Sequence, residues 1–361
     1  MPTPSGKSRA RDLGLPFPGQ PGALNAITDV AGVEVGLCTL RDLSKGLCTG
    51  ITAILPRGKA STPRPVRAGQ FTLNGNGEMT GTHWIHDAGQ FLGPICITNT
   101  HSVGMVHHAA TRWMIDTYDD YFRDEHAWAM PVVAETYDGV LNDINAMAVT
   151  VEDAMSALRS ATPGPVAEGG TGGGAGMICY EFKGGTGTSS RQVEIGGQGY
   201  TIGALVQANH GIRPWLNVLG KPVGQTMTDH RLLDHETGSI IVVLATDAPL
   251  SPLSLRHVAR RAALGVGRGG SPGGNNSGDI FLAFSTVDDG PLQVDPPALL
   301  TRTELNNDGL DPLYLATVES VEEAVVNAMV AGEDTPTFKP AGHVCRALDG
   351  PALAALFAAD S

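Results

Sequence analysis

A serine between a glycine-rich loop and an apolar strand is the first candidate for chemistry in this sequence. Residues 269–286 have the sequence GGSPGGNNSGDIFLAFST, so Ser277 lies just before the apolar run 280–284. Glycine and asparagine readily adopt the backbone angles of sharp turns, and a short apolar run is typical of a buried strand. A hydroxyl held there suits a nucleophile, or a group that attacks its own preceding peptide bond. The alternative is an ordinary turn before a core strand.

Two other predicted strands end in polar groups. The strand predicted at residues 131–135 is followed by Tyr137, and the strand predicted at residues 200–208 is followed by Asn209. Strand ends present side chains to clefts, and hydrogen-bond donors in such a place can stabilise an oxyanion. An Asp-Gly turn is an equally good explanation of the first stretch.

A helix predicted at residues 318–330 carries Ser320 and Glu322 in its first turn. Ordinary helix capping accounts for this pair when it is taken alone, because serine and acidic residues both favour a helix N-terminus.

Glycine and histidine clusters suggest phosphate or metal binding, but their patterns do not fit either function. Residues 169–176 (GGTGGGAG) lack the Gly-Lys-[Ser/Thr] ending of a phosphate-binding loop and lead into a predicted strand instead of a helix. The histidines at positions 83, 86, 101, 107 and 108 form no HExxH motif and have no cysteine partner at ligand spacing. We therefore expect no nucleotide, no metal and no other cofactor.

Composition narrows the class of protein. The 361 residues are 42% hydrophobic and carry a net charge of −13 spread along the chain, which disfavours nucleic acid and anionic membranes as partners. Five widely spaced cysteines without a CxxC motif indicate reduced, buried thiols. The sequence shows neither a signal peptide nor an apolar run long enough to span a bilayer, so a cytoplasmic protein is expected.

The predicted elements favour an α+β fold. Strands outnumber helices, most neighbouring strands are joined by turns, and helices occur in a few blocks, which is typical of a largely antiparallel sheet covered by helices. Strands are predicted at residues 26–37, 177–182 and 239–246, among others, with a long glycine-rich loop at residues 163–176. Residues 1–22 are predicted to be an irregular arm, and residues 23–361 a single domain, because no linker or repeat divides them.

Taken together, four stretches resemble the DmpA-type aminopeptidases, a self-processing serine peptidase family that includes L-aminopeptidase/D-amidase-esterases and β-peptidyl aminopeptidases. They are PVVAETYDGVLND at residues 131–143, LVQANHG at 205–211, NSGDI at 276–280 and ESVEEA at 319–324. The resemblance implies a four-layer αββα sandwich, similar to the N-terminal nucleophile hydrolases but differently connected. It also implies cleavage between Asn276 and Ser277 into an α subunit of residues 1–276 and a β subunit of residues 277–361.

The resemblance also implies the roles of individual residues. Ser277, once N-terminal, is the nucleophile, and its own α-amine, with an unperturbed pKa near 8, accepts the hydroxyl proton. Ser320 and Glu322 match a supporting Ser-x-Glu pair, in which Glu322 orients Ser320 and Ser320 hydrogen-bonds Ser277. Tyr137 and Asn209 match the oxyanion-stabilising positions. Expected substrates are small peptides, amides or esters with a free amino group, and the expected assembly is a tetramer of processed heterodimers.

One departure from the family pattern and three alternative functions accompany the resemblance. Glycine often precedes the nucleophile in the family, whereas Asn276 does so here, and a bulkier residue at the cut bond slows the acyl shift. Within the family, a β-peptidyl aminopeptidase is an alternative. Outside it, the related ornithine acetyltransferases use a threonine nucleophile, and a non-catalytic binding protein could keep the same fold. Ser277 followed by Gly-Asp favours the hydrolase.

Overall fold

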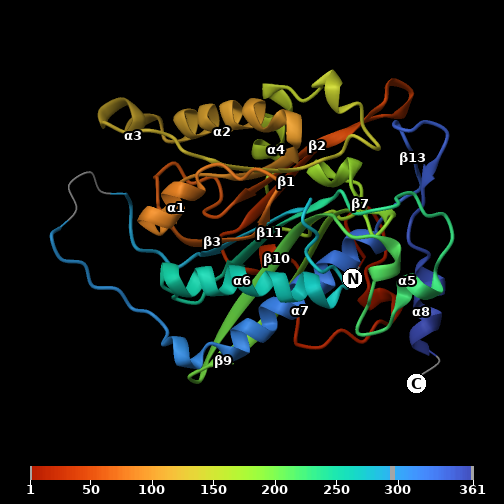
Figure 1. Ribbon diagram of the computed structural model, residues 1–361. Helices are drawn as coiled ribbons and strands as arrows, with labels where there is room; N and C mark the ends of the chain where they lie inside the picture. The colour runs from red at the N-terminus through yellow and green to blue at the C-terminus, as the bar shows by residue number, and fades with distance from the viewer. Residues whose placement is uncertain (1, 293–296, 359–361) are drawn as a thin grey trace.

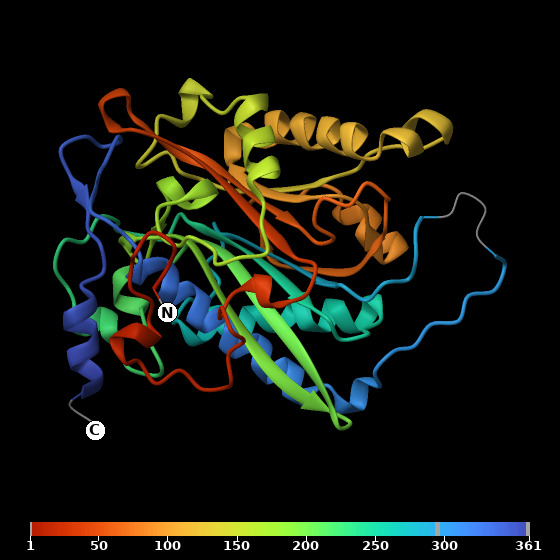
Figure 2. The same cartoon turned by 180° about the vertical axis from the view of Figure 1, so that it is seen from behind.

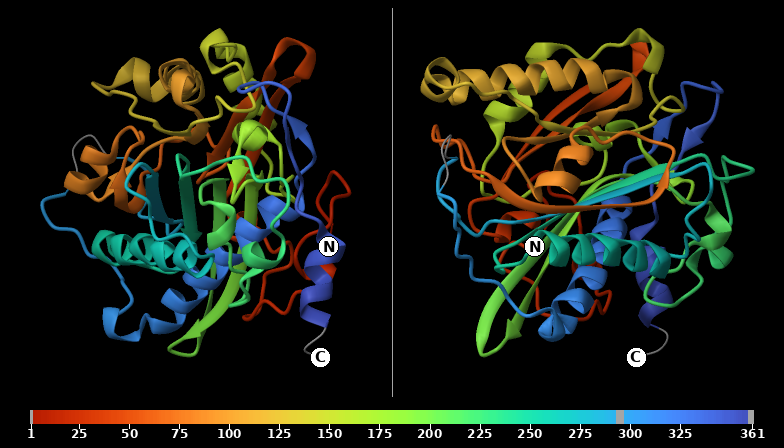
Figure 3. Two further views of the ribbon diagram at one scale, coloured as in Figure 1. Left: turned by 45° about the vertical axis from the view of Figure 1, so that its right-hand side comes forward. Right: turned by 60° about the vertical axis from the view of Figure 1, so that its left-hand side comes forward.

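Two stacked β-sheets lie between two helical layers. The computed structural model describes residues 2–292 and 297–358. Figure 1 and Figure 3 show one pair of helices over the smaller sheet and another pair against the larger sheet. The covering helices are α2 (Val103–Thr117), α4 (Val151–Ser160), α6 (Pro252–Arg268) and α7 (Asp311–Val330). The predicted αββα arrangement of the α+β class is confirmed.

The smaller sheet has the strand order β1-β2-β5-β6. Its strands are β1 (Glu34–Asp42), β2 (Leu47–Leu55), β5 (Ile95–Asn99) and β6 (Val132–Thr136). The first three strands pair antiparallel, whereas β5 and β6 run parallel, with α2 in the connection between them. The carboxyl ends of β5 and β6 therefore meet at one edge.

The larger sheet has the order β4-β3-β12-β11-β10-β9. Its strands are β3 (Val66–Gly75), β4 (Gln90–Phe91), β9 (Gly185–Ile195), β10 (Gln198–Asn209), β11 (Ser239–Thr246) and β12 (Gly278–Ser285). All neighbours are antiparallel except β11 and β12, which run parallel and are connected through α6. This crossover places the first residues of β11 and β12 side by side.

Most of the core of the described residues lies in three apolar layers. One lies between the two sheets, and the other two lie between each sheet and its helices. Strand β11 contributes to two layers, because Ile241 and Val243 face the smaller sheet while Ile240 and Val242 face α6 and α7. A strand buried on both faces gives a continuous apolar run, which is why its position could be predicted from the sequence.

Shorter elements surround the sandwich. They are α1 (Thr82–Ala88), α3 (Asp119–Asp124), α5 (Val223–Thr226), α8 (Gly350–Ala358), β7 (Ile178–Cys179), β8 (Phe182–Lys183), β13 (Thr335–Pro336) and β14 (Val344–Cys345). No helix within residues 2–292 or 297–358 is both long and apolar enough to cross a membrane.

Two predicted strands differ in the structure. The strand predicted at residues 26–37 begins only at Glu34, because the Asp29 carboxylate accepts the N–H groups of Leu24 and Ala26 and closes a turn. In the strand predicted at residues 177–182, Tyr180 and Glu181 have φ angles of 50° and 62° and fold the chain into the β7–β8 hairpin.

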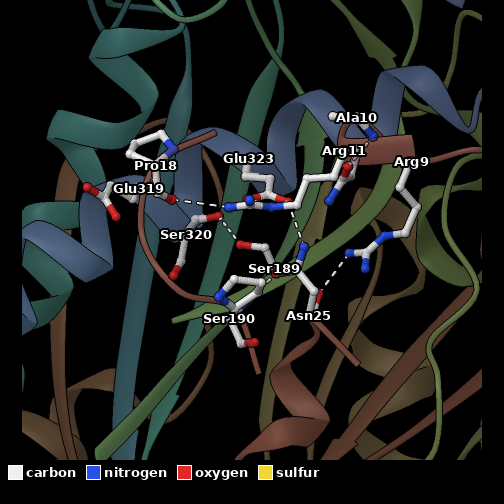
Figure 4. A network of polar contacts seen from close by, with 12 residues as sticks. Arg9, Ala10, Arg11, Pro18, Asn25, Ser189, Ser190, Glu319, Ser320 and Glu323 are labelled. Carbon is white, nitrogen blue, oxygen red and sulfur yellow. Dashed lines mark hydrogen bonds and ion pairs between the residues drawn. The ribbon is translucent and has the colours of Figure 1, made fainter. Parts of the chain in front are cut away.

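The N-terminal arm packs against the domain through charged groups. Figure 2 shows the start of the chain beside β9 and β10, and Figure 4 shows its arginines close to α7. The Glu323 carboxylate of α7 accepts bonds from Arg11 Nε (2.9 Å), Asn25 Nδ2 (2.6 Å) and Arg191 Nη2 of β9 (2.7 Å). Arg9 pairs with Glu168 at 2.6 Å. These buried ion pairs join the arm to α7 and the larger sheet.

Replacing Glu323 by alanine tests this network. Its side chain is fully buried and so is that of Arg191, whose remaining carboxylate contact in the variant is the longer 3.3 Å ion pair with Glu319. A buried charge that loses its partner costs about 3–5 kcal/mol. We expect a much lower urea midpoint for Glu323→Ala. Glu152→Ala, which breaks an exposed pair with Arg159, serves as the control and should barely move it.

Candidate active site

Several strand ends meet at one edge of the sandwich. Asn209, the last residue of β10, pairs with Ser239, the first residue of β11. On the other side of β11, Asp279 of β12 lies opposite Ile240. Tyr137 follows β6 of the smaller sheet. Residues from all these strand ends, far apart in the sequence, are therefore brought to the same edge.

A small cavity opens at this edge. Tyr137 and Asn209 line it together with Thr237 and Gly238, the two residues before β11. The remaining lining residues are Val140, Gly176, Ile178, Gly211 and Leu233. The cavity thus faces the peptide segment that leads into Ser239.

Both predicted oxyanion donors are held in place here. The Asn209 side-chain oxygen accepts the Ile178 N–H at 2.8 Å, and its Nδ2 donates to the Tyr137 carbonyl at 2.9 Å. An amide NH₂ group carries two hydrogens, so one remains for a ligand in the cavity. The Tyr137 hydroxyl accepts a bond from Lys339 Nζ at 3.3 Å and keeps its own hydrogen to donate.

Ser277 lies in a closed polar turn. Its side chain is fully buried, its N–H donates to the Gly274 carbonyl at 2.9 Å, and its hydroxyl donates to Asp279 Oδ1 at 2.5 Å. Burial raises the pKa of Asp279, and the hydrogen bonds from Ser277 and Asn74 oppose that shift. Ser277 and Asp279 therefore form a hydrogen-bonded Ser-x-acid pair within three residues.

Ser239 is a second serine at the start of a buried strand, and it lies beside the first. The N–H of Gly278 donates to Ser239 Oγ at 3.0 Å, so the turn that contains Ser277 also holds Ser239. From its local pattern, Ser239 is predicted only as the beginning of an apolar strand. The signal that could have identified it is Gly238-Ser239 directly at the start of that strand, a junction of small residues like the one at Ser277.

The predicted contacts of Ser320 and Glu322 are not present among the described residues. The Ser320 carbonyl accepts Ser189 Oγ at 2.6 Å, while its own hydroxyl has no partner there. Figure 4 shows Ser320 next to Glu319, Glu323 and the N-terminal arm. Ser189 of β9 is level with Leu244 of β11, five residues from Ser239 or roughly 16 Å along the strand.

Glu322 is held by a different partner. It accepts a bond from Arg268 at the end of α6 at 3.4 Å, and burial raises the pKa of its carboxyl group. Residues two apart on a helix point to different sides, so Glu322 cannot orient Ser320 as the resemblance implied. The local sequence ESVEE matched the Ser-x-Glu pattern, but in the described residues the Ser277 hydroxyl bonds Asp279, and neither Ser320 nor Glu322 bonds Ser277.

Several acidic side chains lie near this edge of the sandwich. Burial raises the pKa of Glu135, next to Tyr137 in β6, and its carboxylate accepts the Thr100 hydroxyl and the Glu78 N–H. Burial also raises the pKa of Asp138, to about 6. The pKa of Glu236 is raised for the same reason. Negative groups at a cleft favour a cationic ligand.

The only histidine in the predicted site is a poor base. His210 follows Asn209, is fully buried against the Tyr180 ring, and has a pKa lowered by burial to about 3. It is therefore neutral and weakly basic at physiological pH. No group of three histidine, cysteine or acidic side chains suited to a metal ion occurs within residues 2–292 and 297–358.

Comparison with known families adds to this geometry. Residues 25–342 match the family described as peptidase family S58. The chain belongs to peptidase family S58. That membership and its relatives make it a hydrolase of the aminopeptidase and amidase type.

Curated relatives and solved structures of S58-type proteins resemble nearly the whole chain. Beta-peptidyl aminopeptidase BapA from Sphingosinicella microcystinivorans is 50% identical over 347 residues, covering 90% of this chain and 86% of that protein. The L-aminopeptidase D-Ala-esterase/amidase of Ochrobactrum anthropi, described as a variant of the Ntn hydrolase fold, has 55% identity and a TM-score of 0.94, covering 98% of this chain and 99% of that one. A Burkholderia sp. beta-aminopeptidase has 45% identity and a TM-score of 0.88, covering 97% and 99%.

The close backbone approach at Gly238 gives a test of the site in this S58 protein. A Cβ atom at position 238 would lie 1.8 Å from the Asn209 carbonyl oxygen, so Gly238→Ala forces β10 and β11 apart. We expect a loss of about 1–3 kcal/mol of stability and of most hydrolytic activity. Gly199→Ala is the matched control, because a Cβ there meets open space. Wild-type stability and activity in Gly238→Ala would contradict the close approach.

Proposed function

We propose that this protein is a self-processing aminopeptidase in which Ser239 is the nucleophile and the Gly238–Ser239 bond is cut. The observation that supports this choice is the cavity, where Tyr137 and Asn209 face Gly238. Ser277 is fully buried and already donates to Asp279, which suits a supporting role. The proposal replaces Ser277 as the nucleophile and also removes the departure at Asn276, because a glycine then precedes the nucleophile.

In self-processing, the serine hydroxyl attacks the carbonyl of the residue directly before it. The Ser239 hydroxyl oxygen attacks the Gly238 carbonyl carbon, the C–N bond breaks, and the nitrogen takes the hydroxyl proton, leaving an ester. Water then hydrolyses the ester, which gives a carboxylate at Gly238 and a free hydroxyl and α-amine at Ser239. The absence of a side chain at Gly238 keeps this carbonyl accessible.

Turnover of a substrate follows the same geometry. The α-amine of Ser239, with an unperturbed pKa near 8, accepts the hydroxyl proton as Oγ attacks the substrate carbonyl. Tyr137 and Asn209 donate to the oxyanion, and the α-ammonium returns the proton to the leaving amine. Water attacks the resulting acyl-enzyme and restores the serine. The Ser277–Asp279 pair orients the α-amine.

The proposed substrates are small peptides, amides or esters with a free N-terminal amine. The acidic groups of Glu135, Asp138 and Glu236 support recognition of an ammonium group at this edge. The relatives are a β-peptidyl aminopeptidase and an L-aminopeptidase D-Ala-esterase/amidase, so β-amino and α-amino residues are both candidates.

The domain organisation is part of the same proposal. Residues 23–361 form one domain preceded by the arm of residues 1–22, and processing divides the chain into residues 1–238 and 239–361. Assembly of processed pairs into a homo-oligomer, and a place in the cytoplasm, rest on the family resemblance and the composition.

Fragment analysis separates the two possible cut sites. On a denaturing gel, wild type should give two fragments, and N-terminal sequencing of the smaller should begin Ser-Ile-Ile-Val-Val. Ser239→Ala should stay intact and inactive. Ser277→Ala still has the attacking hydroxyl of Ser239, so it should be cut at the same bond, but more slowly. A smaller fragment that begins Ser-Gly-Asp-Ile would return the role of nucleophile to Ser277. An uncut wild type with full aminopeptidase activity would rule out self-processing.

The oxyanion role of Tyr137 has its own test. Tyr137→Phe removes one donor, so kcat/KM of the processed enzyme for an aminoacyl anilide should fall about 10²–10³-fold. Tyr200→Phe is the control, since its hydroxyl lies on the exposed part of β10 and bonds only Gln198 among the described residues. Equal rates for the two variants would remove Tyr137 from the mechanism.

A further inference from the structure

The end of β3 approaches the Ser277 turn from the side away from β11. Residues 74–77 have the sequence Asn-Gly-Asn-Gly, and no role in the proposed function uses them. Strand β3 pairs antiparallel with β12, and its Asn74 and Gly75 lie opposite Asp279 and Gly278. This segment is therefore the immediate neighbour of the Ser277–Asp279 pair.

A β-bulge determines which β3 side chain meets Asp279. Ile280 pairs with Thr72 while Asp279 pairs with Asn74, so Leu73 is an extra residue in β3. A bulge re-aims the side chains that follow it. Here it leaves Leu73 partly exposed and directs the Asn74 amide toward Asp279.

All the polar groups of the Asn74 side chain are used at this turn. Its Oδ1 accepts the Asp279 N–H at 2.7 Å, and its Nδ2 donates to Asp279 Oδ2 at 3.3 Å and to the Gly274 carbonyl at 2.9 Å. The second carboxylate oxygen, Oδ1, takes the Ser277 hydroxyl. Asn74 therefore bonds both the backbone N–H and the carboxylate of Asp279. These bonds fix the orientation of the carboxylate that accepts the Ser277 hydroxyl.

Asn76 holds the other end of the turn. Its Nδ2 donates to the Asn276 carbonyl at 2.6 Å, directly before Ser277. Between the two asparagines, Gly75 lies opposite Gly278, whose own N–H bonds Ser239 Oγ. A contiguous set of hydrogen bonds therefore runs from β3 through the Ser277 turn to Ser239.

We propose that Asn74 is a positioning residue for the reaction, which holds the Asp279 carboxylate aimed at Ser277, and that Asn76 fixes the backbone of the same turn. The inference rests on the proposed function, in which the Ser277–Asp279 pair orients the α-amine of Ser239. Asn74 acts through the carboxylate, whereas Asn76 acts only through a peptide carbonyl. The two residues should therefore differ in their effect on pH dependence.

The groups around Asp279 determine whether the loss of Asn74 raises or lowers the pKa of that carboxyl group. Glu236 interacts with Asp279 electrostatically, and Glu135 lies across Gly77 from Gly278. Tyr180 adds no charge, because burial raises its pKa well above the usual value. After processing, the α-ammonium of Ser239 is the nearest expected cation. Donation by Asn74 to the carboxylate favours its ionised form, so removal of Asn74 raises the Asp279 pKa and moves the acidic limb of activity to higher pH.

The experiment compares Asn74→Ala, Asn74→Asp and Asn76→Ala with wild type. We measure kcat and KM of the processed proteins for an aminoacyl anilide across pH, together with the urea midpoint. Asn74→Ala should lower kcat by up to about a hundredfold and shift the acidic limb upward. Asn74→Asp keeps the shape of the side chain but adds a like charge, so it should shift the limb further. Asn76→Ala should slow self-processing or kcat while the limb stays in place.

Several outcomes would overturn the inference. A wild-type pH profile in both Asn74 variants would do so, and so would an equal shift in Asn76→Ala. If Ser239→Ala is inactive but the Asn74 variants behave as wild type, only this inference fails. If Ser239→Ala remains active, the proposed function itself fails, whatever the Asn74 variants do.

Discussion

The parallel pairing of β11 and β12 is the constraint on which the candidate site depends. Antiparallel neighbours would put Ser239 and Ser277 at opposite edges of the sheet, whereas the crossover through α6 starts both strands at the same edge. Because the two buried strands begin at the same edge, the turns that precede them also lie side by side. Backbone N–H groups in these turns can bond groups other than a neighbouring strand. The Gly278 N–H uses this position to bond Ser239.

Other elements meet this edge because of their own pairing. Strand β10 is antiparallel to β11, so its last residue, Asn209, faces Ser239. Strand β6, from the other sheet, ends nearby and adds Tyr137, whose carbonyl accepts the Asn209 amide. The groups proposed for the nucleophile and the oxyanion are therefore positioned by sheet register and by one bond between the sheets, while the donor atoms themselves stay available to a ligand.

Much of this could be predicted from the sequence, but not the assignment of the nucleophile. Continuous apolar runs marked the buried strands, and polar groups after two of them marked Tyr137 and Asn209. Ser277 was placed correctly at a strand start, yet the adjacency of Ser239 depends on a parallel pairing that no local pattern reveals. Ser320 matched a short pattern, but only the path of α7 shows that it faces β9 and the N-terminal arm.

The same register explains how a chain cut before β11 would remain one molecule. The second fragment would begin with β11, which stays bonded to β10 of the first fragment, while β12 stays bonded to β3. Helix α7 adds buried contacts with the arm, through Glu323 to Arg11 and through Asn327 to the Ala10 N–H. Hydrolysis of the 238–239 peptide bond would free an amine at Ser239. The strands on both sides of the cut would keep their partners, so the fragments would stay together. The ion pairs between the arm and α7 would therefore also help to hold the two proposed fragments together.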